Sequence, residues 1–170
     1  VTEVTKDMST KALWKRKTFT STEIFELVNP ATVELKTYRS GDVYYSMGSG
    51  FFIDEDGTLL TNYHVIADAR KVVATTYDGK KYEVTNVLAY DIEKDIALLK
   101  VGSTNTKFAY LEIAQELPKV GEAVWALGSS LGLTGTFSSG IISYANREID
   151  GVNFIQTTTP ISQGNSGGPL

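Results

Sequence analysis

The sequence predicts an all-β fold, either a sandwich or a pair of barrels, with one short helix near the N-terminus. Short runs of β-branched and aromatic residues recur along the chain, and turn-forming residues such as Asp78-Gly79 separate them. A helical pattern of apolar residues is confined to one segment. The chain has 170 residues, of which 42% are hydrophobic and 21% charged, the proportions of an ordinary globular protein.

The N-terminal region is expected to contain an arm followed by that helix. Residues 1–19 have no clear periodicity and are interpreted as an arm or linker. Thr20 and Glu23 have the spacing of a capping box, and apolar residues follow at helical spacing up to Val28. Asn29-Pro30 ends the helix, and the period-two alternation that begins at Ala31 predicts a strand.

The strands are expected in two series. The first comprises residues 31–37, 43–47, 51–53, 59–61, 71–77, 81–90 and 96–101, and the second comprises 123–127, 134–144 and 152–159. The polar residues 102–109 are expected to connect the two series. The predicted organisation is an N-terminal arm with the short helix (1–29), a first β-domain (30–105) and a second β-domain (106–170).

Composition and charge exclude several classes of function. The chain has no cysteine, which excludes disulfides, a thiolate nucleophile and cysteine-ligated metals. The formal net charge is −4, and the one basic cluster is interpreted as a solvated arm rather than a nucleic-acid site; it comprises Lys11, Lys15, Arg16 and Lys17. No apolar run approaches the roughly 20 residues of a membrane-spanning helix, so no membrane span is expected in this chain.

A glycine-rich turn around Ser166 is the most specific chemical pattern in the sequence. Acyl transfer by serine needs a hydroxyl on a tight, exposed turn with backbone N–H groups aimed at the developing oxyanion. Gly164 can present its N–H without a blocking Cβ, and Gly167 with Gly168 lets the turn pack closely. A flexible Gly/Ser loop is the simpler alternative. A phosphate-binding P-loop is the weaker interpretation, because it needs a Lys after its last Gly and then a helix, where this chain has Pro169 and Leu170.

The chain contains a single histidine, His64, directly after a predicted strand. A lone histidine is more often a structural or surface residue, but a serine turn downstream makes this imidazole the candidate base. A carboxylate must orient it, and the local candidates are Asp91, Glu93 and Asp95. Asp95 is favoured because it directly precedes a buried strand, whereas the other two belong to a polar turn.

The acidic residues 54–57 have two interpretations, a calcium loop or a tight turn. An EF-hand loop that began at Asp54 would need a central Gly and a closing Glu. Leu59 and Val65 occupy those positions, so the sequence predicts a turn at Asp56-Gly57.

The chain resembles the HtrA/DegP-type trypsin-like serine proteases over roughly residues 20–170. The motifs that carry the resemblance are Gly48-Ser-Gly-Phe-Phe-Ile-Asp54, Thr61-Asn-Tyr-His-Val65, Asp95-Ile-Ala-Leu-Leu-Lys100 and Gly164-Asn-Ser-Gly-Gly-Pro-Leu170. The order His, Asp, Ser is that of the chymotrypsin fold. The resemblance implies two chymotrypsin-like antiparallel β-barrels, the first supplying His64 and Asp95 and the second supplying Ser166.

The resemblance also implies a mechanism, namely peptide hydrolysis through an acyl-enzyme without a metal or organic cofactor. The backbone N–H groups of Gly164 and Ser166 would form the oxyanion hole. The residues before the nucleophile would form the base of the specificity pocket; they are Pro160, Ile161, Ser162 and Gln163. They include no carboxylate to pair with a substrate Lys or Arg, so cleavage after small or medium aliphatic residues is expected.

The family implies partners and a location. Its members act on unfolded or misfolded proteins in the cell envelope, which implies an extracytoplasmic protein of the periplasmic or secreted type, with its targeting segment outside this chain. They commonly form homotrimers through N-terminal segments. Trp14, Phe19 and Phe25 are the candidates for such contacts, or for packing against the first barrel.

The second barrel is expected to be incomplete in this chain. Only three strands are predicted there, and a complete barrel of this kind needs about six. Little proteolytic activity is therefore expected from these residues alone. The alternatives to a protease are a catalytically silent module with the protease fold, either peptide-binding or chaperone-like, and a purely structural β protein.

Overall fold

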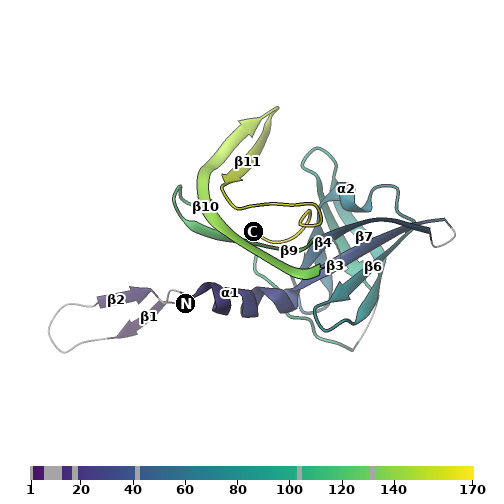
Figure 1. The fold of residues 1–170 in the computed structure, drawn as a ribbon, viewed down its shortest axis with the longest axis horizontal. Helices are drawn as coiled ribbons and strands as arrows, with labels where there is room; N and C mark the ends of the chain where they lie inside the picture. The colour runs from purple at the N-terminus through teal and green to yellow at the C-terminus, as the bar shows by residue number, and fades with distance from the viewer. Residues whose placement is uncertain (1, 6–12, 17–18, 41–42, 103–104, 131–132) are drawn as a thin grey trace.

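The computed structural model describes residues 2–5, 13–16, 19–40, 43–102, 105–130 and 133–170. Strands dominate these residues, and they form a closed barrel, a separate three-stranded sheet and an N-terminal pair, with α1 (Ser21–Val28) between the pair and the rest (Figure 1). The predicted all-β class with a short N-terminal helix is confirmed. None of the helices in these described ranges is long and apolar enough to cross a bilayer.

The first β-domain is a closed antiparallel barrel with the strand order β3-β4-β5-β8-β7-β6. Its strands are β3 (Thr32–Arg39), β4 (Val43–Phe52), β5 (Thr58–Thr61), β6 (Lys71–Thr76), β7 (Lys81–Asp91) and β8 (Ile96–Val101). Closure pairs β3 with both β4 and β6, so no strand of this barrel keeps a free edge. The barrel is therefore a self-contained support for the loops at its ends.

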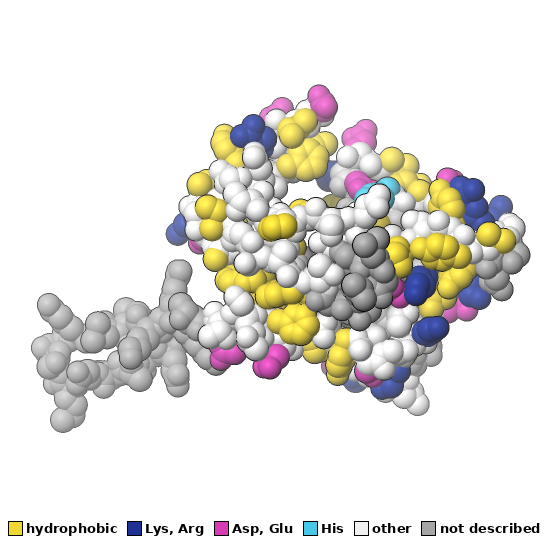
Figure 2. Space-filling view, viewed as in Figure 1, with side chains coloured by type: hydrophobic (Ala, Val, Ile, Leu, Met, Phe, Trp, Pro, Cys, Tyr) yellow, Lys and Arg dark blue, Asp and Glu magenta, His cyan; other side chains and the backbone are white. Residues whose placement is uncertain are grey.

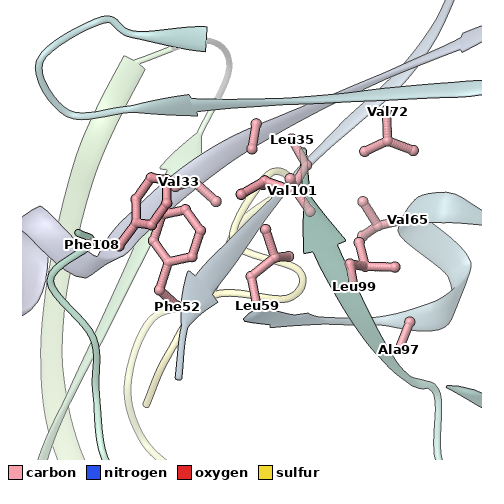
Figure 3. Close-up of a cluster of buried hydrophobic side chains, with 11 residues drawn as sticks. Val33, Leu35, Phe52, Leu59, Val65, Val72, Ala97, Leu99, Val101 and Phe108 are labelled. Atoms are coloured by element: carbon pink, nitrogen blue, oxygen red, sulfur yellow. The ribbon is translucent and has the colours of Figure 1, made fainter. Parts of the chain in front are cut away.

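The barrel interior is filled by alternating apolar side chains. In β8, for example, every second residue is buried, namely Ala97, Leu99 and Val101. They meet side chains from β3, β4, β5 and β6 in one cluster (Figure 3); its members are Val33, Leu35, Phe52, Leu59, Val65, Val72, Ala74, Ala97, Leu99, Val101 and Phe108. Val65 lies outside any strand, so the core also fixes the segment that follows β5.

The second β-domain is an open antiparallel sheet with the order β11-β10-β9. It comprises β9 (Ala123–Ser130), β10 (Leu133–Ile149) and β11 (Val152–Thr157). The prediction of three strands that do not close into a barrel is confirmed. The pairing of β10 with β11 shifts register twice, and this long strand is strongly curved (Figure 1).

The N-terminal helix forms as its capping box predicts. The Glu23 carboxylate accepts the Thr20 N–H at 2.8 Å, and the Thr20 hydroxyl accepts the Glu23 N–H at 3.2 Å. Phe25 packs edge-on against Phe137 of β10, with ring centroids 5.5 Å apart. The aromatic partner of Phe25 thus belongs to the second sheet, and its packing against the first barrel stays a prediction.

The other N-terminal expectations have mixed outcomes. Residues 1–19 were interpreted as an arm without periodicity, but β1 (Thr2–Thr5) and β2 (Leu13–Arg16) pair with each other in it. They pair with no other strand of the described ranges, and they lie apart from the barrel (Figure 1). Phe19 is exposed. The side chain of Trp14 lies outside the described residues.

Residues 43–52 form one strand, β4, where two strands were predicted over 43–47 and 51–53. The expected break fell at Gly48-Ser-Gly50, because glycines weaken strands. These glycines instead make room for neighbours inside the barrel. A Cβ on Gly48 would lie 2.7 Å from the Val65 side chain, and a Cβ on Gly50 would lie 3.0 Å from the Leu60 carbonyl oxygen. The register with β3 continues through both positions.

The connection between the two β-domains packs on the barrel rather than passing freely between the domains. Phe108 is buried, and its ring stacks on Phe52 at 4.2 Å and meets Tyr82 edge-on at 5.0 Å. Its backbone N–H donates to the Glu55 carbonyl at 3.0 Å. Phe108 therefore closes one end of the barrel, although its polar surroundings in the sequence predicted only a loop.

The acidic residues 54–57 form the predicted turn. The Asp54 carboxylate accepts the backbone N–H groups of Asp56 and Thr58, each at 2.9 Å. Partial burial acts to raise the pKa of Asp54, but the hydrogen bonds from Thr58 outweigh it and hold the pKa below its ordinary value. The ionised carboxylate thus stabilises the entry into β5.

A turn at residues 162–168 carries the chain from the second sheet back to the barrel. Gly167 has φ +83, and a Cβ there would lie 2.2 Å from the Thr61 hydroxyl and 2.3 Å from the Ser49 carbonyl oxygen. A Cβ on Gly168 would lie 2.2 Å from the Leu127 carbonyl oxygen of β9. The prediction that these glycines allow close packing of the turn is confirmed.

Replacing Asp54 tests the turn before β5. We expect Asp54→Ala to lower the free energy of unfolding by on the order of 1–2 kcal/mol at neutral pH, since a charged acceptor of two N–H groups is lost. Because the folded pKa lies below the ordinary one, this contribution is present above the ordinary carboxyl pKa and is lost as the pH falls through the folded value. Denaturant unfolding at several pH values would measure it. A difference that does not shrink in acid contradicts the assignment, and Glu116→Ala on the exposed connection is the control.

Replacing Gly167 tests the contact between the turn and the barrel. Gly151 has nearly the same φ, +81, but no atom lies within 4 Å of the Cβ position. We expect Gly151→Ala to cost about 1 kcal/mol from backbone strain alone. Gly167→Ala should cost about 2 kcal/mol more, because the new methyl group meets backbone. Equal changes in urea midpoint for the two variants would contradict this contact.

Candidate active site

The single histidine is carried by α2 (Tyr63–Ile66), one turn of helix between β5 and β6 that sequence patterns did not predict. Four residues are too few to show a helical period. Val65 is 2% exposed and belongs to the barrel core, which anchors the helix. His64, its neighbour, has 57% of its side chain exposed. The imidazole is visible at the surface in Figure 2.

Asp95 is held in an unusual backbone conformation at the start of β8. Its φ is +54, in the left-handed region that non-glycine residues seldom adopt. Its carbonyl oxygen accepts the Tyr63 N–H at 3.2 Å and the Asn62 side-chain amide at 2.8 Å. These bonds hold the backbone of Asp95 against the segment that carries His64, which makes the strained conformation stable.

The Asp95 carboxylate binds His64 through both of its oxygens. Oδ1 accepts the backbone N–H of His64 at 2.8 Å, and Oδ2 lies 2.6 Å from the imidazole Nδ1. An Nδ1 bonded to a carboxylate carries the proton, which leaves Nε2 of the neutral ring as an acceptor. The pair is thus arranged so that the imidazole can take a proton at Nε2.

The neighbouring carboxylates serve other purposes. Asp91 accepts both the backbone N–H and the ammonium group of Lys94, each at 3.0 Å, and these contacts lower its pKa. Glu93 is exposed on the same turn. Of the three candidates drawn from the sequence, the structure brings only Asp95 into contact with His64.

Ser166 lies in the turn that packs on β4 of the barrel. The Ser166 carbonyl oxygen accepts the backbone N–H of Ser49 at 2.8 Å. The Gly164 carbonyl oxygen accepts the hydroxyl of Ser49 at 2.6 Å. Within the turn, Asn165 N–H donates to the Ser162 carbonyl at 3.1 Å. The turn is therefore fixed both internally and to the barrel that carries His64.

Two backbone N–H groups of this turn remain available. Gly164 has φ +95, a conformation that favours glycine. Within the described part of the chain, neither the Gly164 N–H nor the Ser166 N–H donates to another protein group. A free N–H on the serine itself and another two residues before it are donors of the kind that an oxyanion hole requires.

His64 and Ser166 share one cleft of about 350 Å³ at the junction of the barrel and the turn. Residues of β4 and of the turn complete it; the lining comprises Tyr44, Tyr45, Ser46, Met47, His64, Val65, Gln163, Gly164 and Ser166. The side chains of His64 and Ser166 are not hydrogen-bonded to each other in this structure. Such bonds are often long before substrate binds.

The residues expected to form a specificity pocket are less enclosed. Pro160, Ile161, Ser162 and Gln163 are all exposed, and Ile161 is 66% exposed. Only Gln163 of these lines the cleft beside His64. The Pro160 carbonyl accepts the Ser138 hydroxyl of β10 at 2.7 Å, which ties the segment to the second sheet. A pocket built on these residues stays a prediction.

Two sets of residues at the site were missed from the sequence. Tyr44, Tyr45 and Met47 line the cleft from β4, where they count only as strand formers in the sequence pattern. Ser49 lies in the motif of residues 48–54, but the sequence pattern predicted no role for it. A small polar residue between two glycines inside a strand was the available signal, since such a position marks a close backbone approach.

An oriented imidazole, a serine hydroxyl and two unused N–H groups around one cleft are the components of nucleophilic acyl transfer. The comparisons with known proteins agree with this arrangement. The family model described as a trypsin-like peptidase domain matches residues 48–170. This stretch includes the second half of β4, and all of α2, β8 and the serine turn.

Named relatives are similar over nearly three quarters of the chain. A "probable periplasmic serine endoprotease DegP-like" from Halomonas elongata is 44% identical over 74% of this chain, which is 27% of its own length. Proteins with the same name from Chlamydia muridarum and Pseudomonas fluorescens are 38% and 41% identical over 72% and 74% of this chain, 25% and 26% of theirs. The chain thus spans about a quarter of the length of these relatives. With a family model that covers most of its residues and relatives at this level of identity, the chain belongs to the trypsin-like peptidase domain family.

Proposed function

We propose that the protein is a serine endopeptidase that cleaves peptide bonds through an acyl-enzyme. Ser166 Oγ attacks the scissile carbonyl while His64 Nε2 accepts its proton, and Asp95 orients the imidazole and stabilises its charged form. The N–H groups of Gly164 and Ser166 donate to the oxyanion. His64 then returns the proton to the leaving amine, and water hydrolyses the acyl-enzyme by the same steps.

The observation that carries this proposal is the contact of both Asp95 oxygens with His64, beside a cleft that Ser166 also lines. A histidine without a catalytic role does not need one carboxylate to bind its backbone N–H and its ring together. The carboxylate fixes the ring orientation before substrate arrives, which is the main contribution of such a residue to general-base catalysis.

A fluorophosphonate probe tests the assembled nucleophile directly. We expect one adduct in the intact mass of the chain and none in Ser166→Ala or His64→Ala. Asp95→Asn should slow labelling by orders of magnitude, because the imidazole loses its orienting acceptor. Ser139→Ala removes an exposed hydroxyl of β10 and should label like the unmodified chain.

The same experiment separates the alternative of a catalytically silent module that binds polypeptides. That alternative predicts no adduct on the unmodified chain and none on the full-length protein, even though both are folded. An adduct that persists in Ser166→Ala would also contradict the proposed nucleophile.

The proposed substrates are unfolded or misfolded polypeptides, encountered outside the cytoplasm. The location is supported by the word periplasmic in the names of the relatives. The segment Thr159–Gln163 carries no carboxylate, so it offers no partner for a substrate Lys or Arg. Small or medium aliphatic residues are therefore the proposed preference on the acyl side of the scissile bond.

Peptidyl phosphonate probes test this preference. Two probes that differ only in a valine-like or a lysine-like side chain next to phosphorus should label Ser166 at different rates, the valine-like probe being faster. A faster reaction of the lysine-like probe would contradict the proposed preference. Labelling of Ser166→Ala by either probe would expose a reaction elsewhere in the chain.

A further inference from the structure

We propose that Ser49 is a positioning residue whose hydroxyl holds the Gly164 N–H in the orientation that an oxyanion requires. The inference rests on the proposed function and extends it to a residue of the first barrel. Ser49 lies in β4, and its side chain is fully buried beneath the serine turn. The Ser49 side chain takes no part in the reaction itself, so Ser49 can affect catalysis only through the position of the serine turn.

Ser49 contacts both of the residues assigned to the oxyanion hole. Its backbone N–H donates to the Ser166 carbonyl at 2.8 Å, and its hydroxyl donates to the Gly164 carbonyl at 2.6 Å. Its own carbonyl accepts the Thr61 hydroxyl at 2.7 Å, inside the barrel. Ser49 therefore links the barrel to both ends of the Gly164–Ser166 segment.

The hydroxyl of Ser49 fixes one peptide plane in particular. The peptide between Gly164 and Asn165 has its C=O bonded to Ser49 and its N–H bonded to the Ser162 carbonyl. With both sides bonded, this plane cannot rotate without breaking a hydrogen bond. The direction of the Gly164 N–H then depends only on the two dihedral angles of Gly164.

Glycine makes that support necessary. Gly164 needs its φ of +95 to present its N–H, and the absent Cβ makes other conformations equally accessible. A hydrogen bond to its carbonyl supplies the restraint that a side chain would otherwise give. The donor is buried and held in a barrel strand, so the restraint is rigid.

A substitution at Ser49 can remove one of its two hydrogen bonds to the turn and keep the other. Ser49→Ala keeps the backbone N–H that holds Ser166 but removes the hydroxyl that holds Gly164. Ser49→Cys keeps the shape of the side chain with a larger atom in place of the oxygen, and it offers only a weak donor. Thr37→Val is the matched control, because Thr37 is also fully buried in the barrel and its hydroxyl also donates to a backbone carbonyl, that of Ser46, at 3.1 Å.

The test measures the rate of fluorophosphonate labelling together with amide hydrogen exchange at Asn165, on folded variants matched by thermal unfolding. We expect labelling to be slowed about 10- to 100-fold in Ser49→Ala, less than by loss of an oxyanion donor itself, and by an intermediate factor in Ser49→Cys. Exchange at Asn165 should become several-fold faster in Ser49→Ala. Thr37→Val should lose similar thermal stability while keeping both readouts unchanged.

The outcomes distinguish this inference from the proposed function. Wild-type rates of labelling and of Asn165 exchange in Ser49→Ala would overturn the role of Ser49, and so would equal slowing in Thr37→Val. If neither the unmodified chain nor the full-length protein is labelled, the proposed function fails. Hydrogen exchange then decides the matter for Ser49, since unchanged protection of Asn165 overturns the positioning role and faster exchange supports it.

Discussion

The site depends on the hydrogen bonds between Asp95 and the segment from Asn62 to His64. The carbonyl of Asp95 binds Asn62 and Tyr63, while its carboxylate binds the backbone and the ring of His64. These bonds require the left-handed backbone at Asp95, a conformation that costs on the order of 1–3 kcal/mol. The closed barrel stabilises this conformation, because β5 and β8 pair directly beside Asp95 and Val65 is fixed in the core.

The barrel also determines where the serine turn lies. Glycines at 48, 167 and 168 leave out side chains where the turn, β4 and β9 come close together, so the turn can approach β4 closely enough for Ser49 to bind two of its carbonyls. The second sheet contributes through β9, whose Leu127 N–H donates to the Pro169 carbonyl at 3.2 Å. The nucleophile and the base thus come from different parts of the chain, and contacts with the same barrel hold both of them in position.

Local features were predictable from the sequence, and features that depend on distant contacts were not. The capping box at Thr20, the Asp78-Gly79 hairpin and the Asp54 turn each use neighbouring residues, so pattern alone located them. His64, Asp95 and Ser166 stood out by residue type and order. Ser49 did not, because its role comes from a partner 115 positions away. The same holds for α2, which is fixed by core packing, for Phe25, which packs on the second sheet, and for the uninterrupted β4.

The central claim is that Asp95 holds His64 with its proton on Nδ1 and its Nε2 ready to accept another. Because His64 is the only histidine, a nitrogen NMR spectrum shows the signals of one imidazole ring, and they need no assignment by mutation. We expect the neutral ring to be the Nδ1–H tautomer, and we expect Asp95→Asn to abolish this preference. A neutral ring protonated on Nε2, or a tautomer indifferent to Asp95→Asn, would contradict the account.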